Sequence, residues 1–144
     1  MSFGGGLLLA PLSSLLGIRP GMNVCVHQPP EGFMVALEPL PEGVAFIDAS
    51  PLGLDVQVLF SSTKPALIDH LARATQKMSV TGWVWVCFPS NGDAYSPSEE
   101  FVRFAALELG LHDTRRLMLD PAWNALKLQR KGSSPRPEIP EVRA

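Results

Sequence analysis

The stretch of sequence that decides the fold is a strand, a helix and a second strand in direct succession. It reads DVQVLFSSTKPALIDHLARATQKMSVTGWVWVCF and spans residues 55–88. Apolar side chains alternate along Asp55 to Phe60, with both valines and Phe60 on one side, and Trp83 to Phe88 is an uninterrupted apolar run. Both segments are predicted to be strands, and a helix between two strands favours a parallel pair in one sheet.

The helix between these strands has a defined start and an apolar face. Ser62 or Thr63 can cap it, and Pro65 fits its first turn, where a helix has no internal acceptor for the N–H that proline lacks. The buried face is predicted from residues that recur at helical spacing: Leu67, Ile68, Leu71, Ala74 and Met78. His70 has polar neighbours on this helix and is expected to be solvated.

Shorter elements precede this unit. The sequence predicts a helix over Pro11 to Leu16, a buried strand over Met22 to His27, a poor helix over Pro29 to Leu40 and a strand over Val44 to Ile47. The prolines and glycines between these segments mark turns.

A helix and a hairpin follow it. Ser96 to Glu99 has the pattern of a capping box with proline at the first helical position, and Gly110 ends the helix. The residues expected to be buried on this helix are Phe101, Val102, Ala105, Ala106 and Leu109. Thr114 to Leu119 and Trp123 to Gln129 are predicted to be two strands, because the Asp-Pro pair between them favours a turn.

This order of elements predicts an α/β fold with three layers. Right-handed crossovers place helices on both faces of a doubly wound, mostly parallel sheet, and the last hairpin adds an antiparallel strand at the edge. We expect six strands in the spatial order 2-1-3-4-6-5, numbered along the chain. Residues 11–130 are expected to form this single domain, after a flexible leader over residues 1–10 and before a Pro-rich extended tail over residues 131–144.

Composition and charge exclude several classes of protein. The 144 residues include 12 Lys plus Arg and 14 Asp plus Glu, so a net charge of −2 offers no cationic excess for nucleic acid or for an anionic membrane. The apolar run near the N-terminus lacks a cationic start, is broken by Pro11 and is too short to cross a bilayer. We therefore expect a cytoplasmic protein.

The cysteines and histidines do not indicate a disulfide or a metal site. Two cysteines cannot form the disulfide framework of a small secreted protein. Cys25 and Cys87 lie in the middle of the first and fourth predicted strands, with the third strand between them, so two free, buried thiols are expected. No histidine or cysteine pair has metal-ligand spacing, and no metal is predicted.

Six motifs in order resemble the bacterial family called domain of unknown function 3052. They are LGIRPGM (16–22), PEGF (30–33), LPEGV (40–44), LDV (54–56), GWVWV (82–86) and DPAWNALK (120–127). The resemblance runs from about Pro11 to Arg130 and implies no particular reaction, because the family has no established activity. Its members usually carry a Trp-Pro-Lys-Lys-like segment where this chain has Phe88-Pro89-Ser90-Asn91. The element order also resembles a trimmed, Rossmann-like S-adenosylmethionine methyltransferase sheet, a likeness of fold alone.

A ligand site is expected where the strand order reverses, between the first and third strands. The loops from His27 to Glu31 and from Ser61 to Lys64 meet there, and the loop from Pro89 to Asp93 is expected to form one wall. The candidate ligand-binding residues are His27, Glu31, Ser61, Ser62, Thr63 and Asn91. Hydroxyls at a helix N-terminus favour a small anionic ligand, although capping alone also explains them.

Two classes of function stay open. The first is a non-catalytic protein that binds a small molecule or a partner, with no catalytic residue and no cofactor. The alternative is an S-adenosylmethionine-dependent, methyltransferase-like group-transfer enzyme that uses the same crevice. The loop after the first strand favours the non-catalytic protein, because Pro29 and Pro30 remove backbone donors where such a cofactor needs glycines. Asp48, which could bind a ribose, is better explained as a turn residue.

A second surface is predicted on the last helix. Phe104 and Leu107 fall off its buried stripe, so they could contact a protein partner or a second copy of the chain in a homodimer. Trp83 and Trp85 share one face of their strand, which is typical of core packing and leaves stacking on a flat ligand as the alternative.

Overall fold

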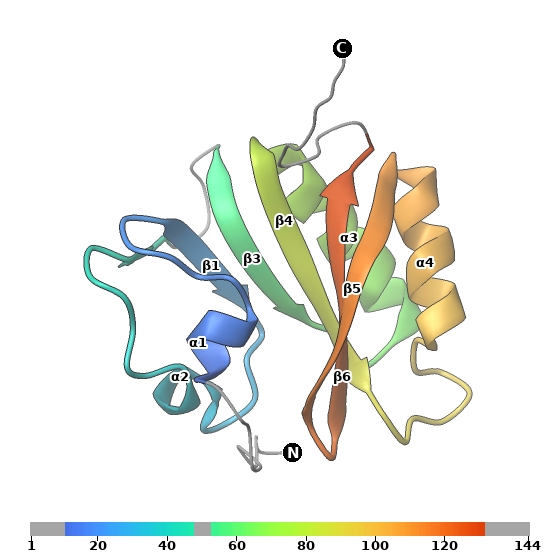
Figure 1. The fold of residues 1–144 in the computed structure, drawn as a ribbon. Helices are drawn as coiled ribbons and strands as arrows, with labels where there is room; N and C mark the ends of the chain where they lie inside the picture. The colour runs from blue at the N-terminus through green and yellow to red at the C-terminus, as the bar shows by residue number, and fades with distance from the viewer. Residues whose placement is uncertain (1–10, 48–52, 132–144) are drawn as a thin grey trace.

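The sheet has six strands in the order β2-β1-β3-β4-β6-β5, as predicted. The structure, a computed structural model, describes residues 11–47 and 53–131, so the leader, Asp48 and nearly all of the tail lie outside the described residues. The strands are β1 (Asn23–His27), β2 (Ala45–Phe46), β3 (Leu54–Phe60), β4 (Met78–Pro89), β5 (Leu111–Asp120) and β6 (Trp123–Arg130). The first four are parallel to one another, and β6 is antiparallel to both β4 and β5 (Figure 1).

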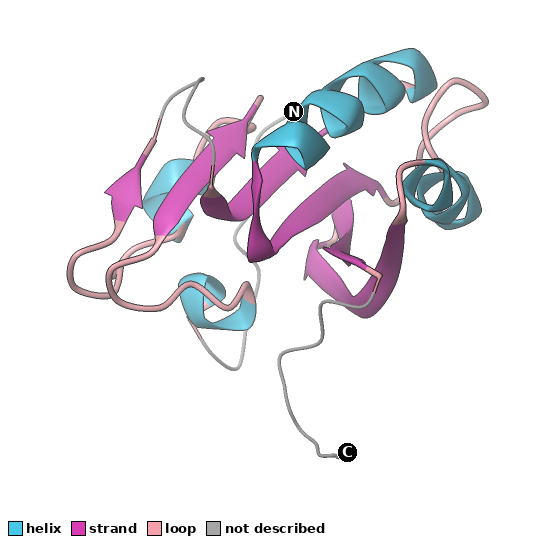
Figure 2. Cartoon of the chain, turned by 90° about the horizontal axis from the view of Figure 1, so that it is seen from above, coloured by secondary structure: helices cyan, strands magenta, loops and turns pink. Residues whose placement is uncertain are grey.

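Helices cover both faces of this sheet, which confirms the doubly wound architecture. They are α1 (Leu12–Leu15), α2 (Phe33–Ala36), α3 (Lys64–Lys77) and α4 (Glu99–Glu108). The long helices α3 and α4 lie side by side against one face, and the short helix α1 lies on the other face (Figures 1 and 2). Within the described ranges, no helix covers the α1 face over β6 and β5 (Figure 2).

The pleat of β3 and β4 divides the core into two layers. Val56, Val58 and Phe60 point towards α1 and α2, as do Trp83 and Trp85. The alternate residues, Leu59, Val84 and Val86, pack against the apolar face of α3 and against α4. Both tryptophans belong to the core, and both indole N–H groups donate to the carbonyl oxygen of Leu16, at 3.1 and 2.8 Å.

The positions of the two cysteines agree with the predicted strand order. Cys25 pairs with Gln57 and Cys87 pairs with Phe60, so β3 lies between them. Both cysteines are buried and neither forms a disulfide, as predicted. Burial raises the pKa of Cys87 well above its ordinary value, which keeps this thiol protonated and unreactive.

Four local predictions need correction. The helix predicted over Pro29 to Leu40 is only one turn, Phe33–Ala36, because prolines flank it on both sides. Strand β4 begins at Met78 rather than at Trp83, since the chain leaves α3 directly into the sheet and Met78 pairs with Leu54. Ile68 is 53% exposed, because it lies on the flank of α3 rather than on the face that packs on the sheet.

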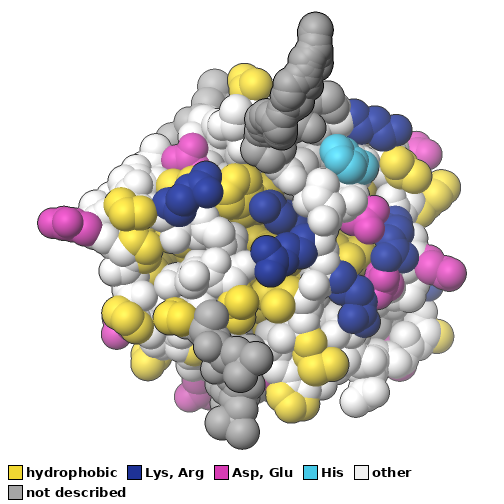
Figure 3. All heavy atoms as spheres, in the orientation of Figure 1, with side chains coloured by type: hydrophobic (Ala, Val, Ile, Leu, Met, Phe, Trp, Pro, Cys, Tyr) yellow, Lys and Arg dark blue, Asp and Glu magenta, His cyan; other side chains and the backbone are white. Residues whose placement is uncertain are grey.

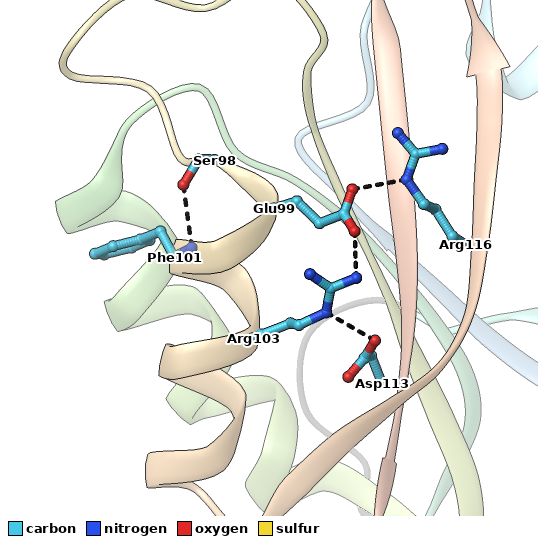
Figure 4. A network of polar contacts seen from close by, with 6 residues as sticks. All are labelled: Ser98, Glu99, Phe101, Arg103, Asp113 and Arg116. Carbon is cyan, nitrogen blue, oxygen red and sulfur yellow. Dashed lines mark hydrogen bonds and ion pairs between the residues drawn. The ribbon is translucent and has the colours of Figure 1, made fainter.

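The start of α4 is the fourth correction. Ser98, not Ser96, is the N-cap, and its Oγ accepts from the N–H of Phe101 at 3.1 Å. Pro97 therefore precedes the helix instead of occupying its first position. Glu99 follows the cap and joins two arginines, one on α4 and one on β5, in a network of ion pairs (Figure 4).

Candidate functional site

The loops after β1 and β3 meet at the carboxyl edge of the sheet, where the strand order reverses. Strand β1 ends at His27, and its neighbour β3 ends at Phe60 beside it in the sheet. The chain then enters α3 through Ser61, Ser62 and Thr63. Polar side chains at the ends of these two strands are thereby brought to one place, as the sequence predicts.

A buried glutamine fixes the tautomer of the neutral His27 ring. The Nε2 group of Gln57 donates to the carbonyl oxygen of Ala74 at 2.8 Å, so its Oε1 is left to accept from Nε2 of His27 at 3.1 Å. His27 must therefore carry its proton on Nε2, which leaves Nδ1 of the neutral ring as an acceptor. Burial lowers the pKa of His27, while the hydrogen bond to Gln57 opposes this and the charges of Lys77 and His70 add to it.

Two cavities open beside these loops. One, of about 310 Å³, lies at the start of α3 and is lined mostly by uncharged residues: Gln28, Pro30, Phe60, Ser61, Ser62, Thr63, Ala66, His70 and Trp123. We call it the crevice cavity. The other, of about 230 Å³, is lined by His27, Gln28, His70, Arg73, Ala74 and Lys77, and we call it the basic cavity. Gln28 and His70 border both, so the two cavities are neighbours.

Three polar atoms at the crevice cavity are buried without a partner. They are Oγ of Ser61, Nδ1 of His70 and Nε1 of Trp123, and none makes a hydrogen bond within the described part of the chain. A buried polar group without a partner destabilises a protein by roughly 1–3 kcal/mol. All three atoms belong to residues that line the crevice cavity, whereas the other buried atoms without a partner, on Ser79, His112 and Asn124, belong to residues that do not.

The first turn of α3 offers no free amide to an anion. The N–H of Lys64 donates to the carbonyl oxygen of Tyr95 at 2.9 Å, Pro65 has no N–H, and the N–H of Ala66 donates to Oγ1 of Thr63 at 3.3 Å. Thr63 is therefore the cap, as the sequence suggests. A ligand in the crevice cavity meets side-chain groups rather than the helix amides on which the anion prediction depended.

The predicted site residues are only partly brought together. Ser61, Ser62 and Thr63 line the crevice cavity, and His27 lines the adjacent basic cavity. Glu31 and Asn91 line neither cavity, and the wall expected from the loop after β4 is supplied instead by Trp123. The prediction assumed that the loop after β4 borders the crevice. In the structure, Trp123 at the start of β6 lines the crevice cavity in place of that loop.

Several site residues were missed by sequence reasoning. His70 is half-buried between the two cavities, not solvated, because only one short turn follows β1 and the flank of α3 faces the loop after it. Gln57 is completely buried. A glutamine within an apolar strand was the available signal for it, since such a residue needs polar partners inside the protein.

The predicted partner patch is exposed. Phe104 and Leu107 are 62% and 53% exposed. An apolar cavity of about 260 Å³ lies between α3 and α4, and Ile68, Phe101 and Phe104 line it. Leu107 lies outside this cavity, so the two predicted residues do not share one groove.

The order and direction of the strands make this a methyltransferase-like α/β fold. Solved structures with this fold include a possible exported protein from Bordetella parapertussis, which is 13% identical with a TM-score of 0.58, over 81% of this chain and 64% of that one. The pyocyanin biosynthetic protein PhzM is 14% identical with a TM-score of 0.57, over 83% and 53%. A SAM dependent methyltransferase from Aquifex aeolicus is 10% identical with a TM-score of 0.54, over 80% and 85%.

These comparisons establish the fold and the family. The chain spans less than two thirds of the length of the first two of these proteins. Residues 53–132 match the family described as protein of unknown function (DUF3052), and the chain belongs to this family, as its motifs suggest. No curated protein matches the sequence. Of the helices in the described ranges, none has the length and apolar character needed to span a membrane.

Proposed function

We propose that this protein binds a small polar molecule in the crevice cavity and does not transform it. The observation that carries the proposal is the set of three unpartnered polar atoms, on Ser61, His70 and Trp123, around one cavity of about 310 Å³. This volume is at the lower end of the range for small-molecule sites, roughly 300–1,000 Å³. The indole N–H of Trp123 can only donate, so the ligand must present an acceptor to it.

The adjacent basic cavity suggests an acidic group at the other end of the ligand. Lys77 lines it, as does Arg73, which also pairs with Asp69 one turn earlier on α3. A carboxylate near the two cations with a hydroxyl or carbonyl oxygen near Trp123 would suit both cavities. This keeps the predicted small anionic ligand but moves its charge from the start of α3 to the flank of the helix.

Methyl transfer is the alternative that the fold suggests. The loop after β1 argues against it, because Pro29 and Pro30 provide no N–H and a single-turn helix follows. Gly32, the one glycine there, has a φ of 90° and starts that turn. We expect millimolar S-adenosylmethionine to leave the melting temperature unchanged. A ligand at 100 times its Kd would add about 2.7 kcal/mol of stability, so a clear upward shift would favour the enzyme.

The proposal is tested by filling the crevice cavity and asking whether the protein still retains a bound small molecule. Ala66→Leu fills the crevice cavity from the half-buried first turn of α3, and Ala72→Leu is the matched control on another flank of the same helix. Small molecules released from each purified protein are identified by mass spectrometry. We expect one compound in the wild type and in Ala72→Leu, and none in Ala66→Leu. No compound in the wild type, or equal amounts in all three proteins, would contradict binding here.

A further inference from the structure

Three cations gather on the α1 face of the sheet, next to the part over β6 and β5 that no described helix covers. Arg19 comes from the loop before β1, Arg115 from β5 and Lys127 from β6. The Nζ of Lys127 lies 4.1 Å from the centroid of the Trp83 ring, and Cζ of Arg19 lies 5.9 Å from the same centroid. Lys and Arg side chains are visible together near the centre of this face in Figure 3.

The register of the hairpin holds two of these charges against each other. Arg115 and Lys127 are directly opposite in the antiparallel pair of β5 and β6, so their side chains leave the same face of the sheet. Like charges in this position are destabilising. Lys127 is half-buried, and its pKa is lowered by that burial and by the charges of Arg115 and Arg19. The fold therefore maintains a repulsive arrangement that a bound anion would relieve.

Three other arginines among the described residues have carboxylate partners. Arg73 pairs with Asp69, Arg103 with Glu99 and Asp113, and Arg116 with Glu99. Over residues 11–47 and 53–131, no ion pair involves Arg19, Arg115 or Lys127. The contrast is sharpest on β5. Arg116 points towards α4 and is neutralised there, whereas its neighbour Arg115 points to the opposite face and has no such ion pair.

We infer that Arg19, Arg115 and Lys127 bind a phosphate group of a small phosphorylated molecule. Three positive charges suit a doubly charged oxyanion, and a guanidinium can hold two of its oxygens at once. A nucleic acid is disfavoured, because the chain has a net charge of −2. The Trp83 ring is only 7% exposed, so it supports Lys127 rather than stacking on a base. These residues are separate from the crevice cavity, so this inference and the proposed function can fail independently.

Calorimetric titration with inorganic diphosphate at low ionic strength tests this site. We expect binding to the full chain, with affinity at least tenfold weaker in Arg19→Gln and in Lys127→Gln. Lys127→Arg should restore most of it, because it keeps the charge. Arg116→Gln is the matched control, since it removes one cation from the same hairpin on the opposite face, and it should bind as the wild type does. Melting curves of all variants establish that they are folded.

Three results would overturn the inference. The first is the absence of diphosphate binding to the wild type at millimolar concentration. The second is an equal loss of affinity in Arg116→Gln, which would indicate attraction by overall charge alone. The third is tighter binding of a short single-stranded oligonucleotide than of diphosphate, which would assign the surface to nucleic acid.

Discussion

Gly17 shows how a single residue shapes the face that carries Trp83. Its φ is +84°, and a Cβ at this position would lie 2.9 Å from Cζ2 of Trp83. Gly21 has nearly the same φ, +79°, but a Cβ there would meet nothing within 4 Å. The two glycines therefore separate the effect of backbone conformation from the effect of close packing.

We expect Gly17→Ala to destabilise the protein more than Gly21→Ala. A left-handed conformation destabilises a non-glycine residue by about 1–2 kcal/mol, and only Gly17→Ala adds a clash with a buried ring. Urea unfolding of both variants measures the difference. Equal losses would mean that the indole ring moves away freely and that Trp83 is not held where the structure places it.

His27 gives the protein a stability that depends on pH. Its folded-state pKa lies below that of the unfolded chain, so the unfolded chain takes up the proton first as the pH falls below about 6.5. The free energy of unfolding should therefore be highest above this pH and fall as the pH is lowered through the folded-state pKa. Urea unfolding between pH 7.5 and pH 5 should show this slope in the wild type, and His27→Gln should reduce it. An unchanged slope in His27→Gln would contradict the assigned protonation state.

One acidic side chain, Glu99, joins α4 to the edge of the sheet. Glu99 pairs with Arg103 on its own helix and with Arg116 on β5, and Arg103 also pairs with Asp113 (Figure 4). The hydrogen bond from Arg116, together with Arg103, lowers the pKa of Glu99. Its stabilising effect is thus complete above the ordinary pKa of a glutamate and is lost as the pH falls through the lowered value.

Glu99→Gln should lower the free energy of unfolding at pH 7 by about 1 kcal/mol, the upper end for partly exposed ion pairs. The difference from the wild type should begin to shrink near the ordinary glutamate pKa of about 4.3 and disappear only below the lowered pKa of the folded state. Glu100→Gln is the matched control, because Glu100 also lies in the first turn of α4 but makes none of these ion pairs. A loss of equal size in Glu100→Gln would assign the effect to the helix dipole instead.

The elements also show what sequence reasoning can and cannot reach. The strand order was predictable, because the rule of right-handed crossovers and the short hairpin at the end leave few arrangements of these strands. The start of β4 was not, because Met78 falls at helical spacing with Leu71 and Ala74 and was therefore assigned to the helix, although it pairs with Leu54 in the sheet. The burial of His70 depends on which loop packs against α3. That is a property of the tertiary structure, and the spacing of apolar residues along the helix cannot predict it.

At the scale of the whole molecule, one sheet presents two surfaces with different chemistry. The carboxyl edge holds the crevice cavity, with uncharged polar groups beside a small basic cavity. The face that carries Trp83 holds three cations without carboxylate partners among the described residues. The methyltransferase-like fold accounts for the position of the crevice cavity, whereas Pro29 and Pro30 leave the loop after β1 without two backbone N–H groups.

The indole N–H resonance of Trp123 tests the central claim most directly. The protein has three tryptophans, and the indole N–H groups of Trp83 and Trp85 are both bonded to Leu16, so they serve as internal controls. Ligand-free protein is prepared by unfolding, dialysis and refolding, and the compound released from the native protein is then added back. We expect the Trp123 signal in a proton–nitrogen correlation spectrum to shift on addition, with the other two unchanged. No shift of Trp123, or a shift confined to Trp83 or Trp85, would contradict a ligand site in the crevice cavity.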